Sequence, residues 1–144
     1  MSYRNCSSIN ITDHTMFEIS IQSIFSAAHR LRHYHGNCES LHGHNWKVSV
    51  TVEASELNPI GLGIDFRELK QKTGTILAQL DHTCLNEHPY FKNINPSSEH
   101  IAQFLFNELK KVIDTPHIRL KKVSVWESEN SWVTYTDNMA TSAR

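Results

Sequence analysis

Residues 42–54 read His42-Gly43-His44-Asn45-Trp46-Lys47-Val48-Ser49-Val50-Thr51-Val52-Glu53-Ala54. From Trp46 onward, apolar and polar side chains alternate in this stretch. A period of two residues is typical of a strand that buries one face against a core. The first apolar run of the chain, Phe17, Ile19 and Ile21, has the same period. We therefore expect two strands, joined by segment 30–41, which is rich in Gly, Asn, Ser, His and charged residues and predicts a long loop.

Two amphipathic helices are expected after these strands. Apolar residues recur at three- and four-residue steps from Phe66 to Leu80, behind Asp65, which stands where an N-cap would. A second such face runs from Ile101 to Ile113, and Asn95-Pro96 offers its N-cap and first-turn proline. The polar segment 81–94 between the helices is expected to be a loop.

Two short strands are expected at the C-terminal end, over residues 123–127 and 132–135. The order strand, strand, helix, helix, strand, strand favours an α+β fold, a four-stranded antiparallel sheet with two helices on one face. The other face of such a sheet has no cover of its own. It must meet solvent, a ligand or another subunit, so we expect a homo-oligomer.

Length and composition exclude several classes of protein. The 144 residues predict a single domain over 16–137, with a flexible N-terminal extension (1–15) and a C-terminal tail (138–144). A formal net charge of −1 leaves no basic excess for binding nucleic acid. No apolar run approaches the ~18 residues of a membrane span. Three cysteines without short spacing favour a reducing compartment, the cytoplasm.

His42 and His44 are the sharpest chemical feature of the chain. Residues i and i+2 of a strand point to the same face, so both imidazoles can bind one metal ion. His29, at the end of the preceding strand, can supply a third ligand. Three histidines with an open fourth position are typical of a catalytic zinc site. The alternative is that His42 and His44 are two surface histidines.

Cys38, four residues before His42, has two interpretations. It can close a structural zinc site as the fourth ligand, or it can be a free thiol beside the metal. A nearby cation lowers the pKa of a thiol, so a free Cys38 would be partly thiolate and able to remove a proton.

Two carboxylates complete the candidate residues. Asp81 precedes His82 in the loop after the first helix, where it can orient the imidazole, although a surface role explains the pair better when it is taken alone. Glu127 has the apolar neighbours Val125 and Trp126, so we expect its carboxylate to end a strand inside a pocket. A buried carboxylate needs a pair of N–H donors or an arginine. A solvent-facing Glu127 is the alternative.

Several short motifs occur together between residues 17 and 135. They are Phe25-Ser26-Ala27-Ala28-His29-Arg30-Leu31, Cys38 followed by His42-Gly43-His44, Leu80-Asp81-His82, Asn95-Pro96-Ser97-Ser98-Glu99, and Val125-Trp126-Glu127-Ser128. This set resembles the 6-pyruvoyltetrahydropterin synthase family. The three residues between Cys38 and His42 look like its bacterial 6-carboxytetrahydropterin synthase branch. Ser97-Ser98 departs from the threonine-containing pair that the family usually has.

The resemblance implies a tunnelling fold (T-fold), in which three subunits close their sheets into a barrel and two trimers stack as a hexamer. The active sites would lie between subunits. It also implies that His29, His42 and His44 hold Zn²⁺, that Cys38 is the thiol base, and that Asp81 and His82 form a proton relay. Glu127 would anchor a pterin, and Glu99 would help to bind it.

The implied reaction converts 7,8-dihydroneopterin triphosphate into 6-carboxy-5,6,7,8-tetrahydropterin, with release of acetaldehyde and triphosphate, on the way to 7-deazaguanines such as queuosine. Two alternatives stay open. One is the 6-pyruvoyltetrahydropterin synthase reaction on the same substrate. The other is a non-catalytic zinc-binding domain in which Cys38 completes the metal site.

Overall fold

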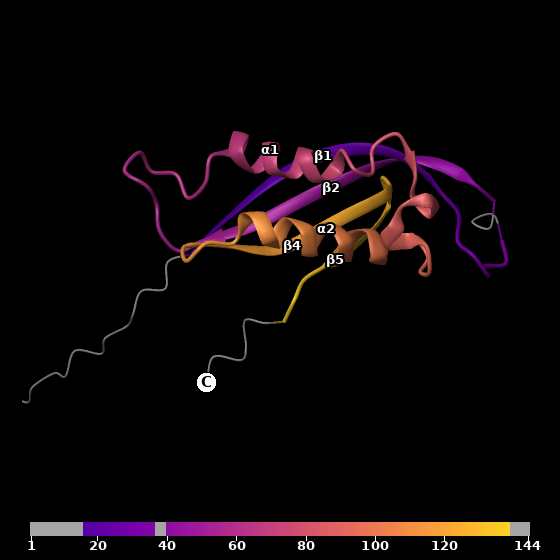
Figure 1. Cartoon of the computed structure of the whole chain (residues 1–144). Helices are drawn as coiled ribbons and strands as arrows, with labels where there is room; N and C mark the ends of the chain where they lie inside the picture. Colours follow the sequence, from indigo (N-terminus) through magenta and orange to yellow (C-terminus); the bar gives the residue numbers. More distant parts are fainter. Residues whose placement is uncertain (1–15, 37–39, 139–144) are drawn as a thin grey trace, which may run out of the picture.

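The computed structural model describes residues 16–36 and 40–138 (Figure 1). Its framework is a long antiparallel hairpin of β1 (Phe17–His29) and β2 (His42–Ala54), in which Phe17 pairs with Ala54 and His29 with His42. β4 (Ile118–Ser128) pairs with β2, and β5 (Ser131–Tyr135) pairs with β4, both antiparallel. The alternation in β2 is confirmed, because the side chains of Trp46, Val48, Val50 and Val52 are fully buried.

Both helices lie on one face of the sheet (Figure 1). α2 (Ser98–Ile113) packs on β4 and β5, while α1 (Phe66–Leu77) packs on β1 and on α2. Their buried residues and the inward side chains of the strands form one core. The expected α+β class is thus confirmed. None of the described helices is long and apolar enough to cross a membrane.

The expectation of four strands is wrong, since the sheet has five in the order β3-β1-β2-β4-β5. The additional strand, β3 (Thr83–Cys84), runs parallel to the end of β1. A strand of two residues is too short to show the alternation of apolar and polar side chains by which strands are predicted. Segment 81–94 was therefore expected to be a loop from its polar composition. The same segment also contains the 3-10 helices η2 (Leu85–Glu87) and η3 (Pro89–Phe91).

The helix ends follow local hydrogen bonds. The carboxylate of Asp65 accepts from the backbone N–H of Arg67 at 2.8 Å, so the expected N-cap of α1 is confirmed. α1 ends before Leu80, whose N–H turns back to Leu77 in a tighter bond although its side chain remains buried. The N-cap of α2 is Ser97 and not Asn95, because the amide of Asn95 bonds to the backbone of Arg32.

The face of the sheet opposite the helices is polar in its middle. Hydroxyl groups pair across strands there, Ser20 with Thr51 at 2.8 Å and Ser124 with Thr134 at 2.6 Å. Trp126 stacks on Trp132, and Lys47 lies 4.4 Å from the centre of the Trp126 ring. No described helix covers this face, which agrees with the expectation of one bare side.

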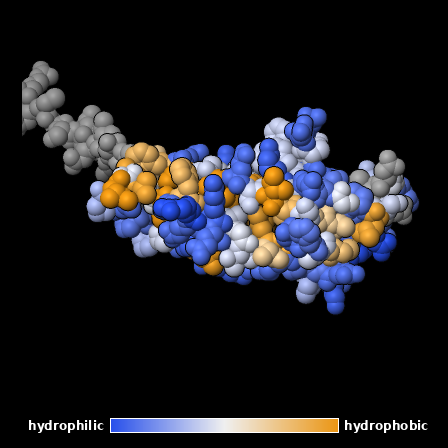
Figure 2. Space-filling model, turned by 90° about the horizontal axis from the view of Figure 1, so that it is seen from above, coloured by the Kyte–Doolittle hydropathy of each residue, from blue (hydrophilic) through white to orange (hydrophobic). Residues whose placement is uncertain are grey.

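One end of the molecule exposes apolar side chains, which gather toward the left of the view in Figure 2. Phe17 begins β1 there, beside Ala54, and the loop from β2 to α1 follows directly. The exposed apolar residues of this end are Met16, Phe17, Leu57, Ile60 and Leu62. Gly63 closes the loop against the sheet, where a Cβ atom would lie 2.6 Å from the Cβ of Ala54.

Candidate functional site

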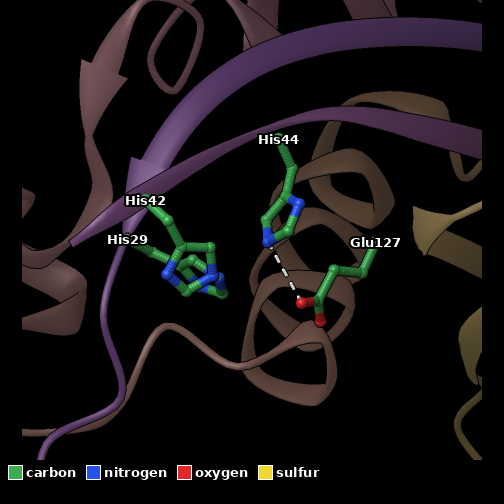
Figure 3. A group of neighbouring side chains, drawn as sticks. All are labelled: His29, His42, His44 and Glu127. Atoms are coloured by element: carbon green, nitrogen blue, oxygen red, sulfur yellow. Dashed lines mark hydrogen bonds and ion pairs between the residues drawn. The ribbon is translucent and has the colours of Figure 1, made fainter. Parts of the chain in front are cut away.

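The opposite end of the sheet brings together three histidines and one carboxylate. His29 is the last residue of β1, His42 the first of β2, and His44 follows two residues later on the same face. Glu127 reaches the group from the neighbouring strand β4. One ligand atom from each of the four side chains lies within 4.8 Å of the others, and Figure 3 shows them pointing toward one another.

Hydrogen bonds fix which ring nitrogens of His29 and His42 face the cluster. Nδ1 of His29 lies 2.7 Å from the carbonyl oxygen of Pro96, and Nδ1 of His42 lies 2.7 Å from that of Ser40. Because a carbonyl only accepts, both Nδ1 atoms carry the hydrogen. The two Nε2 atoms lie 3.1 Å apart, and in neutral rings each presents a lone pair to the other. A cation between them removes this repulsion.

His44 provides an independent sign of a missing partner. Its buried Nε2 lies 3.1 Å from Oε1 of Glu127, yet it makes no aligned hydrogen bond with any described residue. Buried polar atoms are normally hydrogen-bonded, so an orphaned imidazole nitrogen next to a carboxylate fits a metal ligand. Burial is the main cause that lowers the pKa of both His29 and His44. It is opposed mainly by the Pro96 carbonyl at His29 and by Glu127 at His44, so both rings are neutral near pH 7.

The donor set therefore fits a metal ion. Imidazole nitrogens and one carboxylate oxygen suit zinc and other first-row divalent ions, and the Nδ1–H bonds to carbonyls orient two of the rings. The sequence predicted the three histidines. It missed that Glu127 would stand among them, because this depends on how β4 pairs with β2.

A cavity of about 210 Å³ adjoins the cluster. Both carboxylates that were expected to bind substrate, Glu127 and Glu99, line it together with His29. Ser98 donates a hydrogen bond of 3.4 Å to Oε2 of Glu127, and Ser97 caps the helix that carries Glu99. Glu127 thus lies in a pocket near the end of its strand, as expected, although its side chain is 33% exposed.

Asp81 and His82 lie beside β1, where both bond to the backbone of Ser26. Oδ1 of Asp81 accepts the backbone N–H of Ser26 at 2.9 Å and lies 3.0 Å from Nδ1 of His82. The hydrogen bond from Ser26 is the main cause that lowers the pKa of Asp81, and His82 adds to it. His82 and His44 line one surface cavity of about 380 Å³.

The backbone of His82 is in the left-handed region, with φ of 57°. A residue with a Cβ atom rarely adopts this conformation, and it persists where surrounding contacts impose it. Here the N–H of His82 donates to the carbonyl of Ser26 at 2.6 Å, and the imidazole remains 82% exposed. The local fold therefore holds this ring outside the core, facing solvent. Cys38, the remaining expected site residue, lies outside the described residues.

The fold and the cluster together define a class, an α+β protein with a candidate metal site at the end of its central strands. Residues 18–138 match the family described as 6-pyruvoyl tetrahydropterin synthase, and the chain belongs to this family. The resemblance stated from the motifs is thereby confirmed.

Relatives in this family carry two different names. The chain is 35% identical over 114 residues to a putative 6-carboxy-5,6,7,8-tetrahydropterin synthase of Archaeoglobus fulgidus, covering 79% of this chain and 90% of the relative. It is 34% identical over 133 residues to human 6-pyruvoyl tetrahydrobiopterin synthase, covering 82% and 90%. The structure of Caenorhabditis elegans 6-pyruvoyl tetrahydropterin synthase superposes with a TM-score of 0.76 at 30% identity, over 85% of this chain and 96% of that one.

Proposed function

We propose that this chain is a zinc-dependent 6-carboxy-5,6,7,8-tetrahydropterin synthase. It would convert 7,8-dihydroneopterin triphosphate into the carboxylated tetrahydropterin and release acetaldehyde and triphosphate, as a step toward queuosine. The observation that carries the proposal is the cluster of His29, His42 and His44 beside a cavity lined by Glu99 and Glu127. The spacing of Cys38 and His42 supports the carboxy reaction over the pyruvoyl reaction.

The proposed roles follow the chemistry of each group. Zinc, when bound, supplies Lewis-acid stabilisation to oxygens of the substrate side chain. Glu127 and Glu99 accept hydrogen bonds from the amino and N–H groups of the pterin and so fix its distance from the metal. Cys38 removes a proton as a thiolate. His82, oriented and charge-stabilised by Asp81, returns a proton.

We also propose the T-fold assembly for this chain, a hexamer of two stacked trimers. The polar sheet face that no described helix covers supports it, because such a face can line the inside of a barrel. In that assembly the candidate sites lie at subunit boundaries, near the ends of β1 and β2.

Product analysis tests the reaction. The zinc-loaded protein is incubated with 7,8-dihydroneopterin triphosphate, and acetaldehyde and the pterin product are measured. We expect stoichiometric acetaldehyde and a 6-carboxy product. A pyruvoyl product without acetaldehyde would contradict this assignment and favour the second candidate, the reaction named for the human relative.

The Cys38→Ala variant separates catalysis from a purely structural zinc site. We expect it to retain bound zinc and to lose turnover, since three histidines and a carboxylate remain for the metal. Cys84→Ala is the matched control for zinc content, because Cys84 is a free cysteine that does not belong to the cluster. Loss of zinc from Cys38→Ala, with zinc retained in Cys84→Ala, would identify Cys38 as a structural ligand.

A further inference from the structure

The segment that follows His29 is held rigidly although it lies outside the strands. The side-chain amide of Asn86 accepts from the N–H of Arg30 at 2.9 Å and donates to its carbonyl at 3.0 Å. Asn95 bonds in the same two-way manner to the backbone of Arg32, at 2.8 and 3.0 Å. Two asparagines therefore hold the backbone of Arg30 and Arg32 in place, and with it the direction in which the two side chains point.

The guanidinium of Arg32 has hydrogen-bond partners but no counter-charge. It donates to the carbonyl oxygens of Phe91, Ile94 and Asn86 at 3.0, 3.1 and 3.3 Å. Carbonyls satisfy N–H groups without neutralising the positive charge, and a half-buried uncompensated charge is costly. Within residues 16–36 and 40–138, neither Arg32 nor the exposed Arg30 forms an ion pair.

Both arginines line one cavity of about 630 Å³, together with Ser40, Asn86 and Glu87. This cavity lies just beyond the metal cluster, because Arg30 follows His29 and the carbonyl of Ser40 bonds to His42. Leu31, between the arginines, lines the smaller cavity of Glu99 and Glu127 instead. Segment 29–32 thus separates two cavities, one acidic and one with two positive charges against the single carboxylate of Glu87.

We propose that the arginine cavity, defined by Arg30, Arg32, Ser40, Asn86 and Glu87, binds the triphosphate group of the substrate. The inference rests on the proposed function for the identity of the ligand, while the two arginines without ion pairs to described residues themselves point to an anion. The exposed Arg30 offers a planar fork of donors that matches phosphate oxygens, whereas Arg32, which already donates to three carbonyls, contributes mainly its positive charge. Both side chains stay charged at all relevant pH values. The pterin and the oligophosphate would then occupy opposite sides of the metal cluster.

The test measures binding of inorganic tripolyphosphate to the metal-loaded protein by equilibrium dialysis, with metal content checked afterwards so that chelation is detected. We expect Arg30→Gln to weaken binding about tenfold, as loss of a charge-assisted contact does. Arg30→Lys should recover part of the affinity, and Glu87→Gln should strengthen binding. Arg67→Gln, on the exposed surface of α1, changes the charge equally and should have no effect.

Two outcomes overturn the proposal: wild-type protein that fails to bind tripolyphosphate, or Arg30→Gln that binds it as well as Arg67→Gln does. Turnover distinguishes this failure from that of the proposed function. If the variant keeps the KM of the wild type for 7,8-dihydroneopterin triphosphate, the site is wrong and the reaction stands. If tripolyphosphate binding depends on Arg30 but no turnover occurs, the anion site stands and the reaction is wrong.

Discussion

Glu127 occupies the position in the cluster where two roles compete. Its Oε1 lies 3.1 Å from the buried Nε2 of His44, while its Oε2 accepts from Ser98 at the wall of the neighbouring cavity. The first contact is compatible with a metal ligand and the second with a pterin anchor. Because the cavity leaves this side chain one-third exposed, one oxygen remains available to a ligand from outside.

The Glu127→Gln variant decides between these roles. In the amide, a donating NH2 group replaces one of the two acceptor oxygens, so the side chain can no longer accept one N–H group on each oxygen. We therefore expect substrate binding to weaken at least tenfold, about 1.5–3 kcal/mol, with zinc retained. Metal content and KM are measured together. Glu129→Gln, in the exposed turn after β4, is the matched control. Loss of zinc from Glu127→Gln, with zinc retained in Glu129→Gln, would instead identify Glu127 as a metal ligand.

At this scale the sequence predicted what depends on local geometry. His42 and His44 share a face because of the strand period, and His29 was placed correctly at the end of β1. The approach of Glu127 to His44 was not predictable, because it requires the pairing of β2 with β4. The environment of Arg32 likewise depends on three carbonyls far along the chain.

The loop that joins β2 to α1, at the end of the sheet far from the cluster, is tightly packed around Gly63. Gly63 lies so close to the sheet that a Cβ atom would stand 2.7 Å from Cδ1 of Ile19, as well as against Ala54. The Cβ of Ala54 cannot withdraw easily, since Ala54 is fully buried and belongs to β2. Gly74, inside α1, has no atom within 4 Å of the same position.

Two glycine substitutions should therefore change stability in opposite directions. Gly63→Ala should destabilise the protein by about 1–3 kcal/mol, because overpacking forces the loop or the strand to move. Gly74→Ala should stabilise it by about 0.5–1 kcal/mol, the usual gain of alanine over glycine inside a helix. Urea unfolding of both variants and the wild type gives the two differences. Equal effects of the same sign would show that the loop adapts freely.

Helices and long strands were predictable from apolar period and caps, as Asp65 and β2 show. The start of α2 was predicted two residues early, because the amide of Asn95 bonds to Arg32 rather than to the helix. β3 was not predicted from the sequence, for a different reason. Its two residues become a strand only through contact with the end of β1.

On the scale of the whole molecule, the candidate metal site joins three neighbouring strands, β1, β2 and β4. A ligand that binds only the folded state stabilises it by RT ln(1 + [L]/Kd), about 4 kcal/mol at a thousandfold excess over Kd. Metal bound here must therefore stabilise the sheet as a unit, and its removal should lower the free energy of unfolding of the whole domain.

Chelation should accordingly lower the Tm of the zinc-loaded protein, by on the order of 10 °C for a domain of this size. Calorimetry with and without EDTA measures the shift. His42→Ala is the control, since it lacks one ligand and should respond little to the chelator. An equal Tm for the two wild-type samples, with metal demonstrably removed, would mean that the cluster contributes nothing to stability.

Three of the four clustered side chains belong to one hairpin, and this has a consequence for how the chain folds. β1 and β2 are consecutive in the chain, so their pairing closes only the connection 30–41, whereas Glu127 joins the cluster only when β4, more than seventy residues after β2 begins, pairs with β2. A slip of one residue in the hairpin would send His29 to the wrong face. An ion captured by the early hairpin would thus lock its register before the helices dock.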